Sequence, residues 1–183
     1  MTDYTDMELV DMSKNGNEHA FENLVERHYL TVYGLSYKWC RIREDAEEIT
    51  QEVFIKLTRK LNTFTSKSTF RTWLYRITIN TAKDYYRKNA TRRTYESAFA
   101  DDQRHNNPGS LPLDSITARQ VYAAMDKLPD KQKAALMLVA AEGMSHREAA
   151  DVLGCSETTI SWRIHQARRK LKKTCNGWHD YEK

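Results

Sequence analysis

Cysteine, proline and glycine are all scarce in this chain. The three cysteines, Cys40, Cys155 and Cys175, are far apart and odd in number, which argues against a disulfide framework and fits a reducing cytoplasm. The ligand spacing of a zinc site is absent, so we expect no metal and no cofactor. All three prolines lie after Asn107. The first hundred or so residues show almost no strand-like alternation, which favours helices there.

Long apolar runs are also missing. The longest, Ala134–Ala141, has the length of a buried helix segment and falls short of the roughly 18 residues that a membrane span needs. The first residues, MTDYTDMELVDMSK, are acidic and polar, unlike a signal peptide. We therefore expect a cytoplasmic protein. No carboxylate pair, His/Cys cluster or phosphate-binding glycine loop has a usable spacing, so we expect no catalytic residues and no enzyme.

Charge is unevenly distributed, although the net charge is only +4. Residues 1–60 carry 12 acidic and 8 basic side chains, whereas residues 61–93 carry 8 basic side chains and 1 acidic one. Residues 94–126 are acidic again, and residues 154–183 carry 7 basic and 3 acidic side chains. Two basic stretches separated by an acidic one predict two contacts with a polyanion.

The stretch 144–173 has the pattern of two helices joined by a tight turn. Ser145 and Glu148 form a capping box that predicts the start of the first helix. Gly154 predicts its end, because glycine readily adopts the left-handed conformation of a helix stop, and Ser156 can cap the second helix. The second helix has a predicted buried stripe at helical spacing, formed by Ile160, Ile164, Ala167 and Leu171.

The outward face of this second helix is polar and basic, as in a helix-turn-helix, whose recognition helix enters the DNA major groove. An ordinary helical hairpin with a solvated basic face would show the same pattern. The candidate DNA contacts are Thr158, Thr159, Ser161, Trp162, Arg163, His165, Gln166 and Arg168. We expect base edges to be read by Ser161, Trp162, His165 and Gln166, with Arg163 and Arg168 serving phosphates or local packing.

Helical periodicity also runs through the first part of the chain. One apolar face is formed by Phe21, Leu24, Val25, Tyr29 and Val32. His28 falls on it, and we expect a satisfied core histidine because no second metal ligand lies at helical spacing. A second helix is expected over residues 44–61, with acidic early turns that suit the positive end of a helix dipole. Its apolar stripe is Ile49, Val53 and Leu57, with Phe54 alongside.

Phe70–Lys88, FRTWLYRITINTAKDYYRK, interleaves aromatic and basic residues after a polar break over Asn62–Ser68. In proteins that bind single-stranded nucleic acid, the bases stack on aromatic side chains while Lys and Arg side chains contact the phosphates. Aromatic stripes are usually core, so this segment alone leaves both interpretations open. The residues that can face a core are Trp73, Leu74, Ile77, Thr81 and Tyr85, and Tyr75 is among those left outside.

Residues 91–116 lack periodicity and are rich in Asp, Asn, Pro and Gly, which predicts a linker. A structureless loop of this length marks a domain boundary. The sequence therefore predicts an all-α fold of two small helical domains, at residues 1–90 and 117–175. In the second, one helix is expected over about 117–127 and another from Pro129, as its first residue, to Gly143.

In this order, the segments resemble the extracytoplasmic-function group of bacterial sigma factors, of the sigma-E-like kind. DAEEITQEVFIKL (Asp45–Leu57) is similar to the segment that docks on the coiled coil of the polymerase's largest subunit. Phe70–Lys88 is similar to the segment that melts and reads the minus-ten element, and Leu128–Leu171 to the domain that reads the minus-thirty-five element. The resemblance covers about Asp6 to Lys173.

This resemblance implies an alternative sigma factor without an active site, acting in a stress or envelope response. Its partners would be core RNA polymerase, at the coiled coil and the flap, promoter DNA, and an anti-sigma factor, which in this family is often membrane-bound. The implied polymerase-binding residues are Asp45, Glu48, Gln51, Glu52 and Phe54. The implied minus-ten residues are Phe64, Lys67, Arg71, Arg76, Asn80, Lys83 and Arg87, of which Phe64 and Lys67 would line a pocket for a flipped base.

The sequence departs from the family at several positions. Glu48 stands where Asp is usual, Thr50 where an aliphatic residue is usual, and Thr158 where Gly is common; Trp162 is bulky for a base-reading position. The alternative function is a stand-alone helix-turn-helix transcriptional regulator. Such a protein needs a ligand pocket or a dimer interface, neither of which is legible in the sequence, and it would leave the acidic helix without a role.

Overall fold

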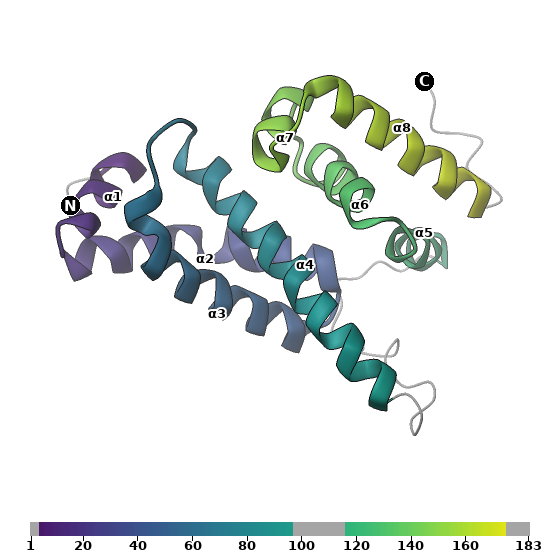
Figure 1. Ribbon diagram of the computed structural model, residues 1–183, viewed down its shortest axis with the longest axis horizontal. Coiled ribbons are helices and arrows are strands. Elements are labelled where there is room, and N and C mark those ends of the chain that lie inside the picture. The colour runs from purple at the N-terminus through teal and green to yellow at the C-terminus, as the bar shows by residue number, and fades with distance from the viewer. Residues whose placement is uncertain (1–3, 97–115, 175–183) are drawn as a thin grey trace. The chain divides into compact units, whose positions relative to one another are not determined.

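The computed structural model describes residues 4–96 and 116–174 (Figure 1). Within these ranges the regular elements are helices and there is no strand, which confirms the all-α fold class. The chain divides into two compact units, Met1–Gly109 and Ser110–Lys183. Side chains are described for residues 4–89 and 121–173. Most of the expected linker therefore lies outside the described residues.

Over its described residues, 4–96, the first unit is built from four α-helices and a short 3₁₀ turn. They are α1 (Asp6–Lys14), α2 (Glu18–Cys40), α3 (Arg43–Lys60), η1 (Leu61–Thr63) and α4 (Phe70–Glu96). Within this unit α1 packs on α2, and α4 packs on both α2 and α3 (Figure 1). The expected helix over 44–61 corresponds to α3. Helix α4 is longer than the sequence suggested, because it continues into the segment expected to be linker.

The core of the first unit includes Leu24, Val32, Ile49, Val53 and Leu57 from the predicted apolar stripes of α2 and α3. Tyr29, expected on the same face of α2, is 42% exposed instead. His28 is a satisfied core histidine, as expected: its Nε2 lies 2.9 Å from Asp6 Oδ2, and its ring meets Phe70 edge-on. The departure at Thr50 also has a physical basis. Its hydroxyl is fully buried and donates to the Ala46 carbonyl at 2.6 Å, so no buried polar group is left unpaired.

The second unit contains α5 (Ile116–Asp126), α6 (Asp130–Leu136), η2 (Met137–Ala141), α7 (His146–Leu153) and α8 (Glu157–Thr174). Two details differ from the sequence prediction. Pro129 is the residue before α6 rather than its first helical residue. The helix expected to continue to Gly143 changes into the π-helical turn η2, which ends at Ala141. Helix α5 lies close to its expected range.

The helix-turn-helix forms as its capping residues predict. Ser145 Oγ accepts from the Glu148 amide, and Glu148 Oε2 accepts from the Ser145 amide at 2.8 Å. Gly154 ends α7 at φ 61°, and Ser156 Oγ accepts from the Thr159 amide to cap α8. The predicted stripe on α8, Ile160, Ile164, Ala167 and Leu171, is buried throughout. The polar face of α8 is therefore turned away from the core of its unit.

Within residues 4–96 and 116–174, no helix is long and apolar enough to cross a membrane. In the same part of the chain, no three His, Cys, Asp or Glu side chains come together in a way that could hold a metal ion.

Candidate nucleic-acid and polymerase interfaces

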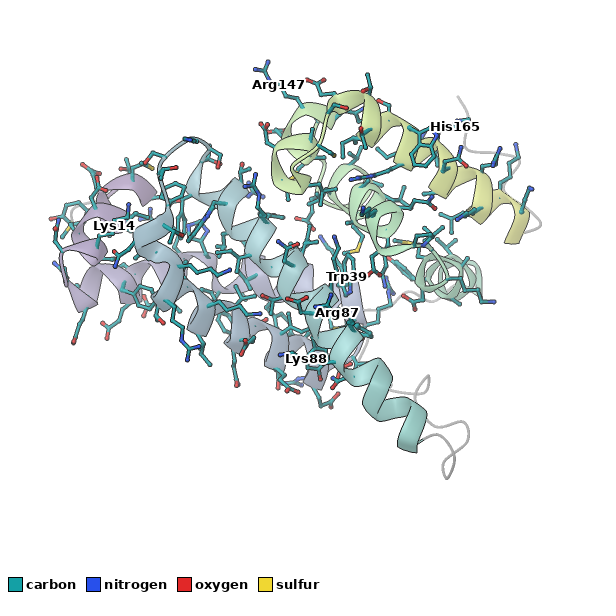
Figure 2. The ribbon with its side chains drawn as sticks, in the orientation of Figure 1. Lys14, Trp39, Arg87, Lys88, Arg147 and His165 are labelled. Carbon is teal, nitrogen blue, oxygen red and sulfur yellow. The ribbon has the colours of Figure 1, made fainter. Side chains whose placement is uncertain are left out.

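Helix α8 presents its expected base-reading residues on the surface. Trp162 is 58% exposed, and Ser161 and His165 are exposed as well, whereas Gln166 is half-buried. A side chain at this exposure contributes little to folding and is accessible to a binding partner. Figure 2 shows His165 projecting from α8 and Arg147 from the preceding helix α7. Arg168 is also exposed.

Some of the α8 candidates are already bonded within the motif. Ser161 Oγ donates to the Glu157 carbonyl and lies 2.9 Å from His146 Nδ1, which joins α8 to the start of α7. Arg163 donates to Cys155 Sγ at 3.3 Å, so it serves local packing. Thr158 and Thr159 contribute hydroxyls to the cap, each 2.8 Å from Ser156 Oγ. By contrast, within the described residues Trp162, His165 and Gln166 make no hydrogen bond through their side chains. Sequence reasoning did not identify His146, since only the fold brings it to Ser161.

Most of the expected minus-ten residues lie on helix α4. Arg71, Arg76, Asn80 and Arg87 are exposed, and Lys83 is half-buried. Figure 2 labels Arg87 and Lys88 on this helix. The Arg71 guanidinium donates to Tyr75 OH at 3.1 Å and lies 5.4 Å from the centre of the Tyr75 ring. Such a pair combines a hydrogen bond with a cation–π contact, so the fold orients Arg71.

Two aromatic residues near this surface, Phe64 and Tyr75, belong to the core, which corrects two expectations. Phe64 is only 3% exposed, and its ring packs 5.8 Å from Phe70 and 5.2 Å from Trp73, measured between ring centres. It therefore supports the Asn62–Ser68 loop from inside and does not line an open pocket. Tyr75, expected outside, is buried under Arg71. Lys67, the other residue expected at this pocket, is exposed on the loop.

The acidic start of α3 is tied to α4 by two tyrosines. Tyr85 OH lies 2.9 Å from both Asp45 Oδ1 and Glu48 Oε2. Tyr86 OH lies 3.2 Å from Asp45 Oδ2 and 3.3 Å from the Cys40 carbonyl oxygen. Burial, followed by the hydrogen bonds to the two carboxylates, raises the pKa of Tyr85 well above the ordinary tyrosine value. Asp45 is consequently half-buried and engaged, whereas Glu48 is exposed.

The rest of the expected polymerase-binding surface combines polar and apolar groups. Gln51 is exposed, and Glu52 Oε1 lies 3.4 Å from Lys56 Nζ. Phe54 is half-buried and stacks on Tyr29 of α2, with ring centres 6.1 Å apart. This stack continues along α2 as an aromatic row, consisting of Phe54, Tyr29, Tyr33 and Tyr37.

Two aliphatic side chains on the same helices face solvent. Leu30 on α2 is 78% exposed and Ile55 on α3 is 48% exposed. Sequence reasoning did not single out these two residues, or Tyr33 and Tyr37. The four-residue spacing of Tyr29, Tyr33 and Tyr37 was the available signal. Exposed apolar side chains close to an acidic helix suit a protein-binding surface.

Comparisons with known proteins match both units. The family model described as Sigma-70 region 2 matches residues 24–92, and the one described as Sigma-70, region 4 matches residues 118–171. The "ECF RNA polymerase sigma-E factor" of Haemophilus influenzae is 33% identical, over 92% of this chain and 94% of the relative. The "RNA polymerase sigma-H factor" of Pseudomonas aeruginosa is 31% identical, over 94% of this chain and 95% of the relative.

Solved structures resemble the chain as well. CnrH, solved in complex with the cytosolic domain of CnrY, is 28% identical with a TM-score of 0.65, covering 92% of this chain and 95% of the other. The sigma factor RpoE of Bartonella quintana, solved with the anti-sigma factor NepR, also gives a TM-score of 0.65. It is 23% identical over 86% of this chain and 97% of the other, and so supports the fold alone.

Proposed function

This chain belongs to the extracytoplasmic-function sigma factors, and from that membership we propose that it binds core RNA polymerase and directs it to a particular class of promoters. It has no chemistry of its own in this role. The observation that carries the proposal is a pair of polar, basic helix faces, each in its own unit: one on α4 and one on α8. Recognition of two promoter elements needs two such surfaces, and a stand-alone helix-turn-helix regulator would use only the second.

The surface on α4 and the preceding loop suits capture of the opened minus-ten strand. Unpairing a base costs a few kcal/mol, which contacts made only to single-stranded DNA must offset. Asn80 is exposed and carries both a donor and an acceptor for a base edge. The cations that would follow the phosphates are Lys67, Arg71, Arg76, Lys83 and Arg87.

The surface on α8 suits duplex recognition at the minus-thirty-five element. Trp162, His165 and Gln166 would face base edges in the major groove, where side chains on the first turns of a recognition helix reach. Arg168 would bind the phosphate backbone, which adds affinity without sequence information. Ser161 and Arg163 hold the motif together through their internal hydrogen bonds.

The exposed face of α3 suits docking on the coiled coil of the polymerase's largest subunit. Glu48 and Gln51 supply polar contacts, while Phe54 with the aromatic row supplies apolar area. Complementary charge speeds encounter, and apolar anchors slow release. Asp45 positions this face through Tyr85 and Tyr86 rather than contacting the partner directly. By the family resemblance, the second unit would contact the polymerase flap.

Regulation by an anti-sigma factor, in a stress or envelope response, forms part of the same proposal. The similar CnrH structure contains the cytosolic domain of a second protein, CnrY. An anti-sigma factor that covers the docking surfaces would prevent this chain from binding polymerase, and its release would allow binding again. The partner's own membrane attachment would place the signal at the cell envelope.

The test combines promoter DNA, core polymerase and permanganate footprinting of the minus-ten thymines. The double variant Asn80→Ala, Lys83→Ala should still recruit polymerase but leave these thymines unreactive. Lys60→Ala is the matched control, since it removes one positive charge from an exposed site at the end of α3, and it should open the promoter normally. Thymines that react as in the wild type in the double variant would show that α4 does not open DNA.

Polymerase docking, and DNA binding in the absence of polymerase, are tested in separate experiments. Gln51→Ala with Glu52→Lys should lower affinity for core polymerase while leaving the circular dichroism spectrum unchanged. Omitting polymerase distinguishes the alternative function: a stand-alone regulator shifts promoter DNA by itself, whereas this chain should do so only with core polymerase present.

A further inference from the structure

Helix α1 lies outside the residues that the Sigma-70 region 2 model matches, which begin at residue 24. The fold nevertheless integrates it firmly. In its first turn, the Asp6 carboxylate lies 3.0 Å from Arg27 Nη1 and 2.9 Å from His28 Nε2, both on α2. In its middle, Leu9 and Val10 are completely buried. The helix is therefore a fixed support, and its last turn can hold another element in place.

The last turn of α1 contacts the loop between α3 and α4. Lys14 Nζ donates to the Phe64 carbonyl oxygen at 2.7 Å and lies 5.7 Å from the centre of the Phe64 ring. Figure 2 shows Lys14 on α1. A short, partly buried hydrogen bond from an ammonium group is stronger than one between neutral groups. The two contacts fix both the main chain and the side chain of Phe64.

Phe64 is the point from which the exposed part of this loop departs. Its amide donates to the Leu61 carbonyl at 3.1 Å, and its ring is enclosed by Phe70 and Trp73. Thr65, Ser66 and Lys67 then face solvent. Ser66 has a φ of 57°, which a residue other than glycine adopts at an energetic cost. Such a conformation persists only where its surroundings are held, so the loop depends on its anchor.

We propose that Lys14 is a positioning residue for promoter opening: by holding Phe64 it sets where the Thr65–Ser68 part of the loop meets the opened minus-ten strand. The inference rests on the proposed function of this loop and of α4. It assigns α1 a role in promoter discrimination, because a displaced loop would alter the fit of the captured base. Lys14 itself touches no DNA in this proposal.

The test compares Lys14→Met, which keeps the aliphatic chain but removes the donor and the charge, with Lys14→Arg, which keeps both. Lys60→Met controls for the loss of one positive charge near the same loop. With core polymerase bound, permanganate reactivity is measured on two promoters that differ at one minus-ten base pair. Lys14→Met should reduce opening about tenfold on the better promoter, as expected for one lost hydrogen bond from a charged donor. It should also bring the ratio of permanganate reactivities on the two promoters closer to one. Lys14→Arg should restore most of the opening and most of this ratio.

The possible failures are distinguishable. If Lys14→Met opens both promoters as the wild type or Lys60→Met does, the inference is wrong, provided that Asn80→Ala, Lys83→Ala still leaves them closed. If that double variant also opens normally, the proposed function of the loop and α4 has failed. If Lys14→Met lowers polymerase affinity and scales opening of both promoters equally, Lys14 only stabilises the fold, and the inference is overturned.

Discussion

The two helices proposed to meet DNA, α4 and α8, are built in opposite ways. Helix α8 has one buried stripe, and most of its other residues are exposed or half-exposed. Helix α4 is buried around most of its circumference: Leu74, Tyr75, Ile77, Thr78 and Ile79 are all inaccessible. Between Phe70 and Ala82 the exposed side chains are Arg71, Arg76 and Asn80, and further along the helix Arg87 and Lys88 are exposed as well.

This difference matches the two tasks. A recognition helix enters a groove of an intact duplex and needs a wide polar face. A helix that takes part in strand opening must hold single-stranded DNA in a fixed geometry, and rigidity comes from burial in a packed core. It follows that substitutions in α4 should mainly affect folding unless they are made at its exposed positions, whereas those on the polar face of α8 should mainly affect DNA binding.

The largest expected effect is on the free energy of unfolding, when one aromatic residue in each helix is replaced by alanine. Tyr75→Ala should cost about 3–5 kcal/mol of the free energy of unfolding, because it empties a fully buried site. Trp162→Ala should cost less than about 0.5 kcal/mol, as its ring is mostly exposed. Urea denaturation followed by circular dichroism measures both, and Tyr75→Phe is the control that keeps the ring. Equal costs for the two alanine variants would refute the contrast between the helices.

The next effect concerns sequence discrimination by α8. Trp162→Ala and Gln166→Ala should each reduce the preference for the cognate upstream element by about 1–3 kcal/mol per lost base contact. Arg168→Ala should instead weaken all promoters to a similar extent, since phosphate contacts carry no sequence information. Competition between promoter variants, with core polymerase present, measures these preferences. A uniform loss for Trp162→Ala and Gln166→Ala would mean that α8 does not read bases through these residues.

A smaller effect is expected where α4 is tied to α3. Tyr85→Phe deletes the hydroxyl that bonds Asp45 and Glu48, and should cost about 1 kcal/mol, because the site is only partly buried and water can replace the bonds. The folded-state pKa of Tyr85 is raised above the unfolded value of about 10. Its stabilisation is therefore complete below pH 10 and is lost as the pH rises above 10 towards the folded pKa.

The measurement is urea denaturation of Tyr85→Phe and wild type at pH 8 and across the alkaline range. The difference between them should shrink above pH about 10. Tyr29→Phe is the matched control, since Tyr29 is more exposed and its ring can keep its stack with Phe54. A Tyr85→Phe variant that matches wild-type stability at pH 8 would show that the tie contributes nothing to folding.

The sequence was sufficient to predict helix ends and buried positions wherever these depend on interactions between residues close together in the chain. The capping box at Ser145, the stop at Gly154 and the buried stripe on α8 each depend on residues a few positions apart, and each was confirmed. The observed start and end of α3 each lie within one residue of the predicted range for the same reason. His28 could be assigned to the core because only one metal ligand was available on its face.

Sequence reasoning failed where residues distant along the chain decide the outcome. Phe64 and Tyr75 are chemically suited both to stacking on bases and to filling a core. Only their neighbours in three dimensions, Phe70 and Trp73 around Phe64 and Arg71 over Tyr75, determine which applies. The ties from Lys14 to Phe64 and from Tyr85 to Asp45 span 50 and 40 positions. No local pattern predicts such partners.

The smallest predicted changes in stability come from replacing one glycine in each unit by alanine. Gly154 ends α7 with a φ of 61°, so Gly154→Ala should destabilise the chain by about 1 kcal/mol, the cost of placing a Cβ in the left-handed region. Gly34 lies inside α2 with a negative-φ helical backbone, and an added Cβ there would meet nothing within 4 Å. Gly34→Ala should therefore stabilise by about 0.5–1 kcal/mol, since alanine loses less backbone entropy on folding. Urea denaturation of both variants should show opposite signs. Equal signs would mean that local backbone geometry does not control stability at these two positions.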